Sequence, residues 1–368
     1  MQTVKYLQQH GLTKTVEDFR LLHKRHNTFP NLVLLKYDAI ESPMGESVSQ
    51  ECRSLIVDEN NNWKPVAYPY MKFFNLGEGH AAEIDWNTAQ VFEKLDGSII
   101  TLYFYNNTWH ISTSGVPDAS APLNDTGVTF ADMFWKVWQR LGYSLPNETQ
   151  YCYMFELMTP FNRVVVQHSK SNIVLHGVRD MFTLKEYNPN FFAQKNNWEC
   201  VKVFHLNNFD AVVNAANVLN PVESEGFIVC DGNFNRVKIK SPQYVALHHL
   251  KGTMSVRRMI EIILANENSE FLTYFPEFQP LYDVIKEKFD DLINRILVVY
   301  SENKHLEDRK SFALKVKDYE FAFACFSLYN TKPTDEKVEL RRVLSGCNIR
   351  HIESILQVDN LNLISNMD

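Results

Sequence analysis

The sequence predicts an α+β fold, in which a domain of antiparallel sheets is followed by an all-α C-terminal domain. Up to about residue 240, the chain consists mostly of short runs rich in β-branched and aromatic residues and bounded by Asn, Gly, Asp and Pro, as is typical of strands and turns. After Ser241 the apolar residues recur with the 3.6-residue period of helices. A chain of 368 residues is long enough for two or three domains.

The predicted strands of the first part have apolar patterns that end at turn-forming residues. Their ranges are 32–38, 52–58, 91–105, 108–114, 151–158, 162–168, 171–180, 226–232 and 236–241. Helical patterns lie between them at 129–142 and 210–219. This mixture is typical of an α+β domain.

The C-terminal part shows helical periodicity almost throughout. Helices are predicted at 256–265, 280–302, 308–330 and 334–344. Thr334 is expected to cap the last of these, since acidic residues follow it in the first turn. We therefore divide the chain into a first domain of residues 1–242 and a helical domain of residues 243–368.

Composition argues against secreted and membrane classes. The N-terminal stretch mixes charged and polar residues and lacks the apolar core of a signal peptide. The longest nearly apolar run, 321–329, is about half of the roughly 20 residues that a membrane-spanning helix needs. The six cysteines are scattered without a CxxC pair, which argues against a zinc ribbon or a disulfide framework. We expect a cytoplasmic protein with reduced thiols and no membrane partner.

The net charge of −7 is unusual for a protein that binds nucleic acid, because neutralising phosphates normally requires a basic surface. A nucleic-acid function would therefore depend on local cations, and on a bound nucleotide and metal ions.

A Lys-x-Asp-Gly pattern stands at residues 94–97. It is consistent with a hairpin that turns at Asp96-Gly97. It is also consistent with a nucleophilic Lys94 at a rigid strand end, where the amine attacks an α-phosphate and Gly97 lets the backbone approach closely. A lysine attacks only as the neutral amine, so nearby cations, such as other lysines or hydrated magnesium, would have to favour loss of its proton. The pattern alone does not decide between a simple hairpin turn and a nucleophilic lysine.

Basic and acidic residues that fit the hypothesis of a nucleophilic Lys94 occur further along the chain. Lys238 and Lys240 lie on one face of a predicted strand because strand side chains alternate. A solvated strand would show the same pattern. Glu156 and Glu225 lie within apolar runs, where a carboxylate needs a partner. A ribose hydroxyl would suit one and a magnesium ion the other, but a structural ion pair would explain each equally well.

The residues Lys94-Leu95-Asp96-Gly97, Phe155-Glu156-Leu157, Glu225-Gly226-Phe227 and Lys238-Ile239-Lys240 follow the order seen in the covalent nucleotidyltransferase superfamily, which contains DNA ligases, RNA ligases and capping enzymes. The segments 51–59, 71–78, 160–167 and 238–248 further resemble the phage RNA ligase 1 family, typified by the tRNA-repair ligase of phage T4. The resemblance covers roughly residues 30–250. It implies an adenylyltransferase domain, an ATP-grasp-like nucleotidyltransferase, ahead of the helical domain.

The resemblance also implies roles for individual residues. Lys94 would be the adenylylated nucleophile. Arg53 and Lys72 would hold the β- and γ-phosphates of ATP, and Tyr37 would lie near the nucleotide. The remaining roles are ribose binding by Glu156, metal binding by Glu225, α-phosphate contacts by Lys238 and Lys240, and a ligation function for Tyr244.

One position departs from the family pattern. Where the family has an essential lysine in a Lys-Gly pair, this chain has Ser114 before Gly115. Either another cation, such as Lys170 or Arg179, takes its place, or one reaction step is handled differently.

The expected activity is ATP-dependent joining of RNA ends that carry a 5′-phosphate and a 3′-hydroxyl, with Mg²⁺ or Mn²⁺, through lysyl-AMP and RNA-adenylate intermediates. RNA repair, with tRNA as a substrate, an end-healing kinase/phosphatase as a partner and a monomeric state, is part of this expectation. The alternatives are an RNA-end-binding protein with altered catalysis, and a DNA ligase or capping-type enzyme. The helical pattern after Ser241 argues against the last two, in which an OB-fold of short strands usually follows.

Overall fold

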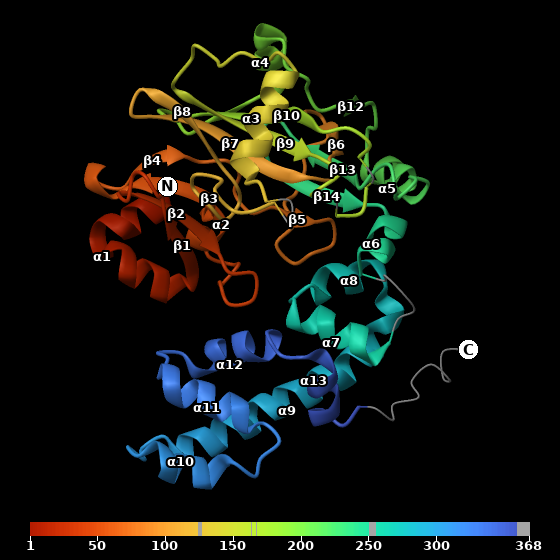
Figure 1. Ribbon diagram of the computed structural model, residues 1–368. Helices are drawn as coiled ribbons and strands as arrows, with labels where there is room; N and C mark the ends of the chain where they lie inside the picture. Colours follow the sequence, from red (N-terminus) through yellow and green to blue (C-terminus); the bar gives the residue numbers. More distant parts are fainter. Residues whose placement is uncertain (124–126, 163, 167, 250–254, 359–368) are drawn as a thin grey trace. The chain divides into compact units, whose positions relative to one another are not determined.

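The computed structural model describes residues 1–123, 127–162, 164–166, 168–249 and 255–358 (Figure 1). The chain divides into two compact units, Met1–His248 and His249–Asp368. The predicted domain boundary, between residues 242 and 243, falls at the start of helix α6 (Pro242–His249).

The first unit contains three sheets. The first has the order β1-β2-β3-β4 and consists of β1 (Leu21–Arg25), β2 (Leu32–Tyr37), β3 (Arg53–Asp58) and β4 (Lys64–Ala67). The second has the order β11-β10-β9-β7-β8 and consists of β7 (Ser98–Tyr105), β8 (Thr108–Ser112), β9 (Tyr151–Met158), β10 (Asn172–Asp180) and β11 (Glu186–Tyr187). The third has the order β12-β6-β13-β14-β5 and consists of β5 (Phe74–Asn75), β6 (Gln90–Lys94), β12 (Val203–Phe204), β13 (Gly226–Cys230) and β14 (Arg236–Lys240). Among the described strands, every pair is antiparallel except β5 with β14.

The register of the third sheet brings predicted site residues together. Gly226 on β13 pairs with Lys94 on one side and with Lys240 on the other. Because Glu225 directly precedes Gly226 in the chain, its side chain starts between the two lysines. The second and third sheets meet at the turn between β6 and β7, which contains Gly97.

The helices of the first unit cover the sheets (Figure 1). They are α1 (Gln2–Phe19), α2 (Ser47–Glu51), α3 (Phe130–Arg140), α4 (Pro189–Asn196), α5 (Phe209–Asn217) and α6, with the short 3₁₀ helix η1 (Glu59–Asn61). Helix α3 starts at a capping box, in which Thr129 and Asp132 satisfy each other's backbone N–H groups. Its buried face, which includes Phe134 and Trp138, packs on the second sheet. Helix α5 packs Val212 and Ala216 against the third sheet in the same way.

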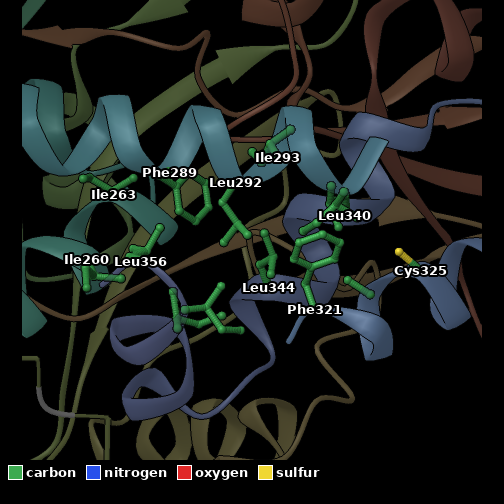
Figure 2. Packing of buried hydrophobic residues seen from close by; sticks show 14 of the residues in the cluster. Ile260, Ile263, Phe289, Leu292, Ile293, Phe321, Cys325, Leu340, Leu344 and Leu356 are labelled. Carbon is green, nitrogen blue, oxygen red and sulfur yellow. The ribbon is translucent and has the colours of Figure 1, made fainter. Parts of the chain in front are cut away.

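The second unit is helical throughout its described residues. It consists of α7 (Val256–Leu264), α8 (Asn268–Tyr274), α9 (Gln279–Asn303), α10 (Arg309–Val316), α11 (Ala322–Thr331), α12 (Glu336–Ser345) and α13 (Ile349–Ile355), with the 3₁₀ helix η3 (Pro276–Phe278). Figure 2 shows its core, in which Phe289, Leu292 and Ile293 of α9 meet apolar side chains of α7, α11 and α12. The core is contiguous, so these helices form one packed unit.

Three sequence predictions differ from the structure. The predicted strand 162–168 is wrong, since its described residues form bends and loop, while 163 and 167 lie outside the described residues. The single helix predicted at 308–330 is two helices, α10 and α11, with a turn between them. Thr334 is not the cap of α12, because the side chain of Asp335 accepts the hydrogen bonds from Lys337 N and Val338 N.

In the described part of the chain, no helix combines the length and apolar character that crossing a bilayer would need. All six cysteines are free thiols, as the absence of a CxxC pair predicted.

Replacing a buried aromatic side chain of the helical unit should destabilise it strongly. Phe312 is fully buried on α10 and stacks on Tyr329 at a centroid distance of 4.1 Å. Phe312→Ala should lower the free energy of unfolding by about 3–5 kcal/mol, as measured by urea denaturation of the whole chain. Leu314 on the same helix is 59% exposed, so Leu314→Ala should leave it nearly unchanged. Equal losses in both variants would contradict the packing described for α10.

Candidate active site

Seven of the predicted site residues line one cavity of about 870 Å³ in the first unit. This volume lies within the range of about 300–1,000 Å³ that is common for ligand sites. The seven residues are Tyr37, Arg53, Lys94, Gly97, Glu156, Lys238 and Lys240. They come from all three sheets, so the cavity depends on how the sheets pack together.

Lys94 and Lys240 share one carboxylate. The Lys94 Nζ atom lies 2.6 Å from Glu225 Oε2, and the Lys240 Nζ atom lies 3.3 Å from Glu225 Oε1. The Glu225 side chain is only 5% exposed, so it is held between two cations at the edge of the cavity, as buried carboxylates usually require. The sequence left open whether Glu225 forms a structural ion pair. The structure contains such an ion pair, and one of the two lysines in it is Lys94, the proposed nucleophile.

The turn after Lys94 is fixed by Asp96. Its buried carboxylate accepts hydrogen bonds from the backbone N–H groups of Val165 and Val166, at 2.9 and 2.7 Å. The backbone oxygen of Asp96 lies 2.6 Å from His168 Nε2. Asp96 thus connects the turn that carries Lys94 to the 159–168 loop.

Gly97 is required by a close approach of strand β9. A Cβ atom at this position would lie 2.5 Å from the backbone oxygen of Leu157 and 3.1 Å from Glu156 Cγ. The sequence predicted that Gly97 lets the backbone approach closely, and in the structure the backbone that lies closest belongs to strand β9, which carries Glu156.

Arg53 offers a buried donor to the cavity. Among the described residues, its Nη1 atom is buried without a hydrogen-bond partner. The guanidinium lies over the rings of Phe73 and Tyr70, at 4.5 and 5.9 Å from their centroids. Burial lowers the pKa of the Arg53 guanidinium. Because an unpaired buried donor is costly, an anionic ligand is the natural acceptor for Nη1.

Three predicted residues do not line this cavity, but each contacts a residue that does. Lys72 donates from Nζ to the Tyr37 hydroxyl at 3.3 Å and lines a neighbouring cavity of about 610 Å³. Glu225 binds Lys94 and Lys240, as described. Tyr244, on α6, is buried with its ring centroid 5.7 Å from Lys240 Nζ, within the distance of a cation–π contact.

Neither Lys170 nor Arg179, the two cations suggested as substitutes for the family lysine, lies beside Ser114 in the cavity wall. Ser114 lines the cavity, and its backbone oxygen accepts a hydrogen bond from Ser54 Oγ at 2.8 Å. Lys170 and Arg179 are not among the described residues that line this cavity. Arg179 is instead held by Glu186 at 2.6 Å.

Many residues of the cavity wall were not singled out from the sequence, among them Lys36, Tyr70, His176 and Arg236. The sequence does contain a pattern that marks Arg236, because this residue continues the alternation of Lys238 and Lys240 on one face of β14. Its guanidinium donates to Glu186 at 2.5 Å and lies over the Tyr70 ring. No local pattern distinguishes Tyr70 or His176, which come together only in the folded chain.

In the described residues, no group of three or more His, Cys, Asp or Glu side chains is arranged to hold a metal ion. Glu225 alone therefore stands as the predicted metal ligand, and that role stays a prediction.

A cavity of nucleotide size, with lysines paired through a buried carboxylate and an arginine donor awaiting an anion, defines an enzyme that acts on phosphate esters. The family model described as RNA ligase matches residues 51–244, which is more than half of the chain. The chain therefore belongs to the RNA ligase family, and it is an RNA ligase. The resemblance to the phage RNA ligase family is confirmed.

The chain is also similar to individual proteins and to solved structures. An RNA ligase of Rhodothermus phage RM378 is 28% identical over 346 residues, covering 73% of this chain and 78% of that protein. A putative bifunctional polynucleotide kinase/RNA ligase of Autographa californica nuclear polyhedrosis virus is 27% identical over 302 residues, covering 76% of this chain but only 42% of that protein. A solved archaeal ATP-dependent RNA ligase is 11% identical with a TM-score of 0.45, covering 86% of this chain and 89% of that one.

A methyl group at position 97 should disturb the junction between the sheets. Gly97→Ala should lower the free energy of unfolding by about 1–3 kcal/mol, because the Leu157 backbone cannot easily move away. Chemical denaturation would measure this loss. Gly115→Ala is the matched control, since a Cβ there meets nothing within 4 Å. An unchanged stability of the Gly97 variant would show that β9 does not pass so close to the turn.

Proposed function

We propose that this RNA ligase joins a 5′-phosphate end to a 3′-hydroxyl end in three steps, with ATP as the AMP donor and Lys94 as the covalent residue. The observation that carries the proposal is the position of Lys94, at the cavity wall with its amine on Glu225 and a second lysine on the same carboxylate. Lys238 and Arg53 line the same cavity, so phosphates bound there would lie among cations.

In the first step the Lys94 amine attacks the α-phosphorus of ATP. An N–P bond forms, the bond from the α-phosphorus to the bridging oxygen breaks, and pyrophosphate leaves. The amine must first lose a proton, and Glu225 Oε2, at 2.6 Å, is in position to accept it. Arg53 and Lys72 would bind the departing phosphates, consistent with the unpartnered Nη1 atom of Arg53.

In the second step an oxygen of the RNA 5′-phosphate attacks the same phosphorus, and the P–N bond breaks to return the amine of Lys94. In the third step the 3′-hydroxyl attacks the 5′-phosphorus, a phosphodiester forms and AMP leaves. Each step is a displacement at phosphorus, so alignment and charge stabilisation carry most of the catalysis.

Magnesium, or manganese in its place, would be held by Glu225 together with the nucleotide phosphates. One carboxylate can be enough for such a site, because magnesium commonly binds through one or two carboxylates plus substrate phosphates and keeps its remaining waters. When bound, the ion would neutralise charge on the phosphates.

RNA repair is the proposed biological setting. The relative from Autographa californica nuclear polyhedrosis virus is named as a putative bifunctional polynucleotide kinase/RNA ligase, which supports a kinase partner that prepares the RNA ends for this chain. Cleaved tRNA as the substrate, a monomeric state and a cytoplasmic location complete the proposal.

Removing the Lys94 amine should abolish the covalent intermediate. Lys94→Ala, incubated with labelled ATP and a divalent cation, should form no protein-AMP, while sealing of RNA that already carries a 5′-adenylate should be largely spared. Lys14 is exposed on α1, so Lys14→Ala should behave as the wild type. A Lys94→Ala variant that still forms the adduct at a normal rate would remove Lys94 from its role. A wild type that binds RNA ends but forms no adduct would favour the alternative of an end-binding protein.

The ribose contact predicts a preference among nucleotides. If Glu156 accepts a hydrogen bond from the ribose, 2′-deoxy-ATP should be the poorer donor, and Glu156→Ala should narrow the difference. Such a bond to a charged group contributes about 1.5–3 kcal/mol, so initial rates of adduct formation would resolve it. Glu59 pairs with Arg25 away from the cavity, and Glu59→Ala should keep the preference. Equal use of both nucleotides by the wild type would count against this role of Glu156.

A further inference from the structure

The Glu156 carboxylate meets a histidine at the wall of the nucleotide cavity. His176 Nε2 lies 3.4 Å from Glu156 Oε2, and the two side chains are 17% and 14% exposed. The described residues provide no other ion pair for this carboxylate. Glu156 also lines the cavity, so a ligand bound there can reach its carboxylate.

His176 reaches this position through a β-bulge. Strands β9 and β10 pair Phe155 with Leu175 and then Met154 with Gly177, so His176 is an extra residue without a partner. A bulge changes the direction of the side chain that it carries. The extra residue in β10 is the one whose imidazole faces Glu156 and lines the cavity.

Tyr70 holds the other side of the imidazole. The Tyr70 hydroxyl lies 2.8 Å from His176 Nδ1 and 3.0 Å from the His176 backbone oxygen, and its single proton can go to only one of these two acceptors. The two rings are also stacked, with an interplanar angle of 23°. When the hydroxyl donates to Nδ1, the ring proton is on Nε2, which faces Glu156 Oε2 at 3.4 Å, because the tautomer of a histidine is set by the partner of its other nitrogen.

Gly177 makes room for this arrangement. A Cβ atom at position 177 would lie 2.0 Å from the Tyr70 hydroxyl oxygen. The bulge, the glycine and the buried tyrosine thus act together on one imidazole.

We propose that His176 is a positioning residue that sets the sugar specificity of the ligase. It holds Glu156 Oε2 and thereby aims Oε1 at the ribose hydroxyl of the bound nucleotide. The inference rests on the proposed function, since it assumes that a ribonucleotide occupies the cavity. Its consequence is that discrimination between ATP and 2′-deoxy-ATP depends on a residue that does not itself touch the sugar.

The test compares initial rates of protein-AMP formation with ATP and with 2′-deoxy-ATP. His176→Leu should reduce the ratio of the two rates by about twofold to tenfold, the range expected for one hydrogen bond. His176→Gln, which keeps an N–H donor, should recover part of the ratio. His205 is exposed outside the cavity, so His205→Leu should keep the wild-type ratio.

A double variant separates positioning from general damage. If His176 acts through Glu156, adding His176→Leu to Glu156→Ala should not lower the ratio further, because coupled residues are not additive. The proposal would be overturned if His176→Leu kept the wild-type ratio of the two rates. It would also be overturned if adding His176→Leu to Glu156→Ala lowered the ratio by the same factor as His176→Leu lowers it in the wild type. Both outcomes hold whatever the thermal stability of these proteins. If the wild type itself forms no adduct with ATP, the proposed function fails instead, so the two failures are distinguishable.

Discussion

The site depends on one interaction, the binding of two lysines by the Glu225 carboxylate. Glu225 is buried and holds Lys94 at 2.6 Å and Lys240 at 3.3 Å. Without it, two ammonium groups would face each other at the edge of a partly closed cavity, where charges interact more strongly than in water. Three neighbouring strands, β6, β13 and β14, must keep their register for this contact to exist, because Gly226 pairs with both lysines.

A second constraint joins this sheet to the one that carries Glu156. The turn from Lys94 to Gly97 is short, and it is fixed from two sides. The Asp96 carboxylate binds backbone N–H groups of the 159–168 loop, while β9 passes so close that only glycine fits at position 97. Lys94, the proposed nucleophile, and Glu156, the proposed ribose-binding carboxylate, are therefore placed relative to each other by contacts that fix the backbone of the turn.

The same residues explain why a chain with a net charge of −7 can belong to a family that acts on RNA. The cations that matter are gathered on the wall of one cavity, where Arg53, Lys238 and Lys240 lie together. Local concentration of charge, and not the total, determines whether a phosphate is attracted to a cleft.

The sequence by itself determined the α+β class, most strands, the helical C-terminal part and the order of the motifs. Each of these follows from short-range patterns, in which side-chain periodicity and turn residues act within a few positions. The sequence did not determine that the described residues of 162–168 form bends and loop instead of a strand. The apolar residues of this segment predicted a strand. In the structure, however, the backbone N–H groups of Val165 and Val166 donate hydrogen bonds to the Asp96 carboxylate, some 70 residues earlier in the chain.

Only the tertiary structure decided how Tyr70, His176 and Glu156 meet, and that Arg236 rather than Arg179 reaches the nucleotide cavity. These contacts join strands and loops far apart in the chain. They depend on the bulge at His176 and on the space left by Gly177. A bulge shifts the alternation of a strand by one residue, so a pattern of period two cannot reveal where the side chain points.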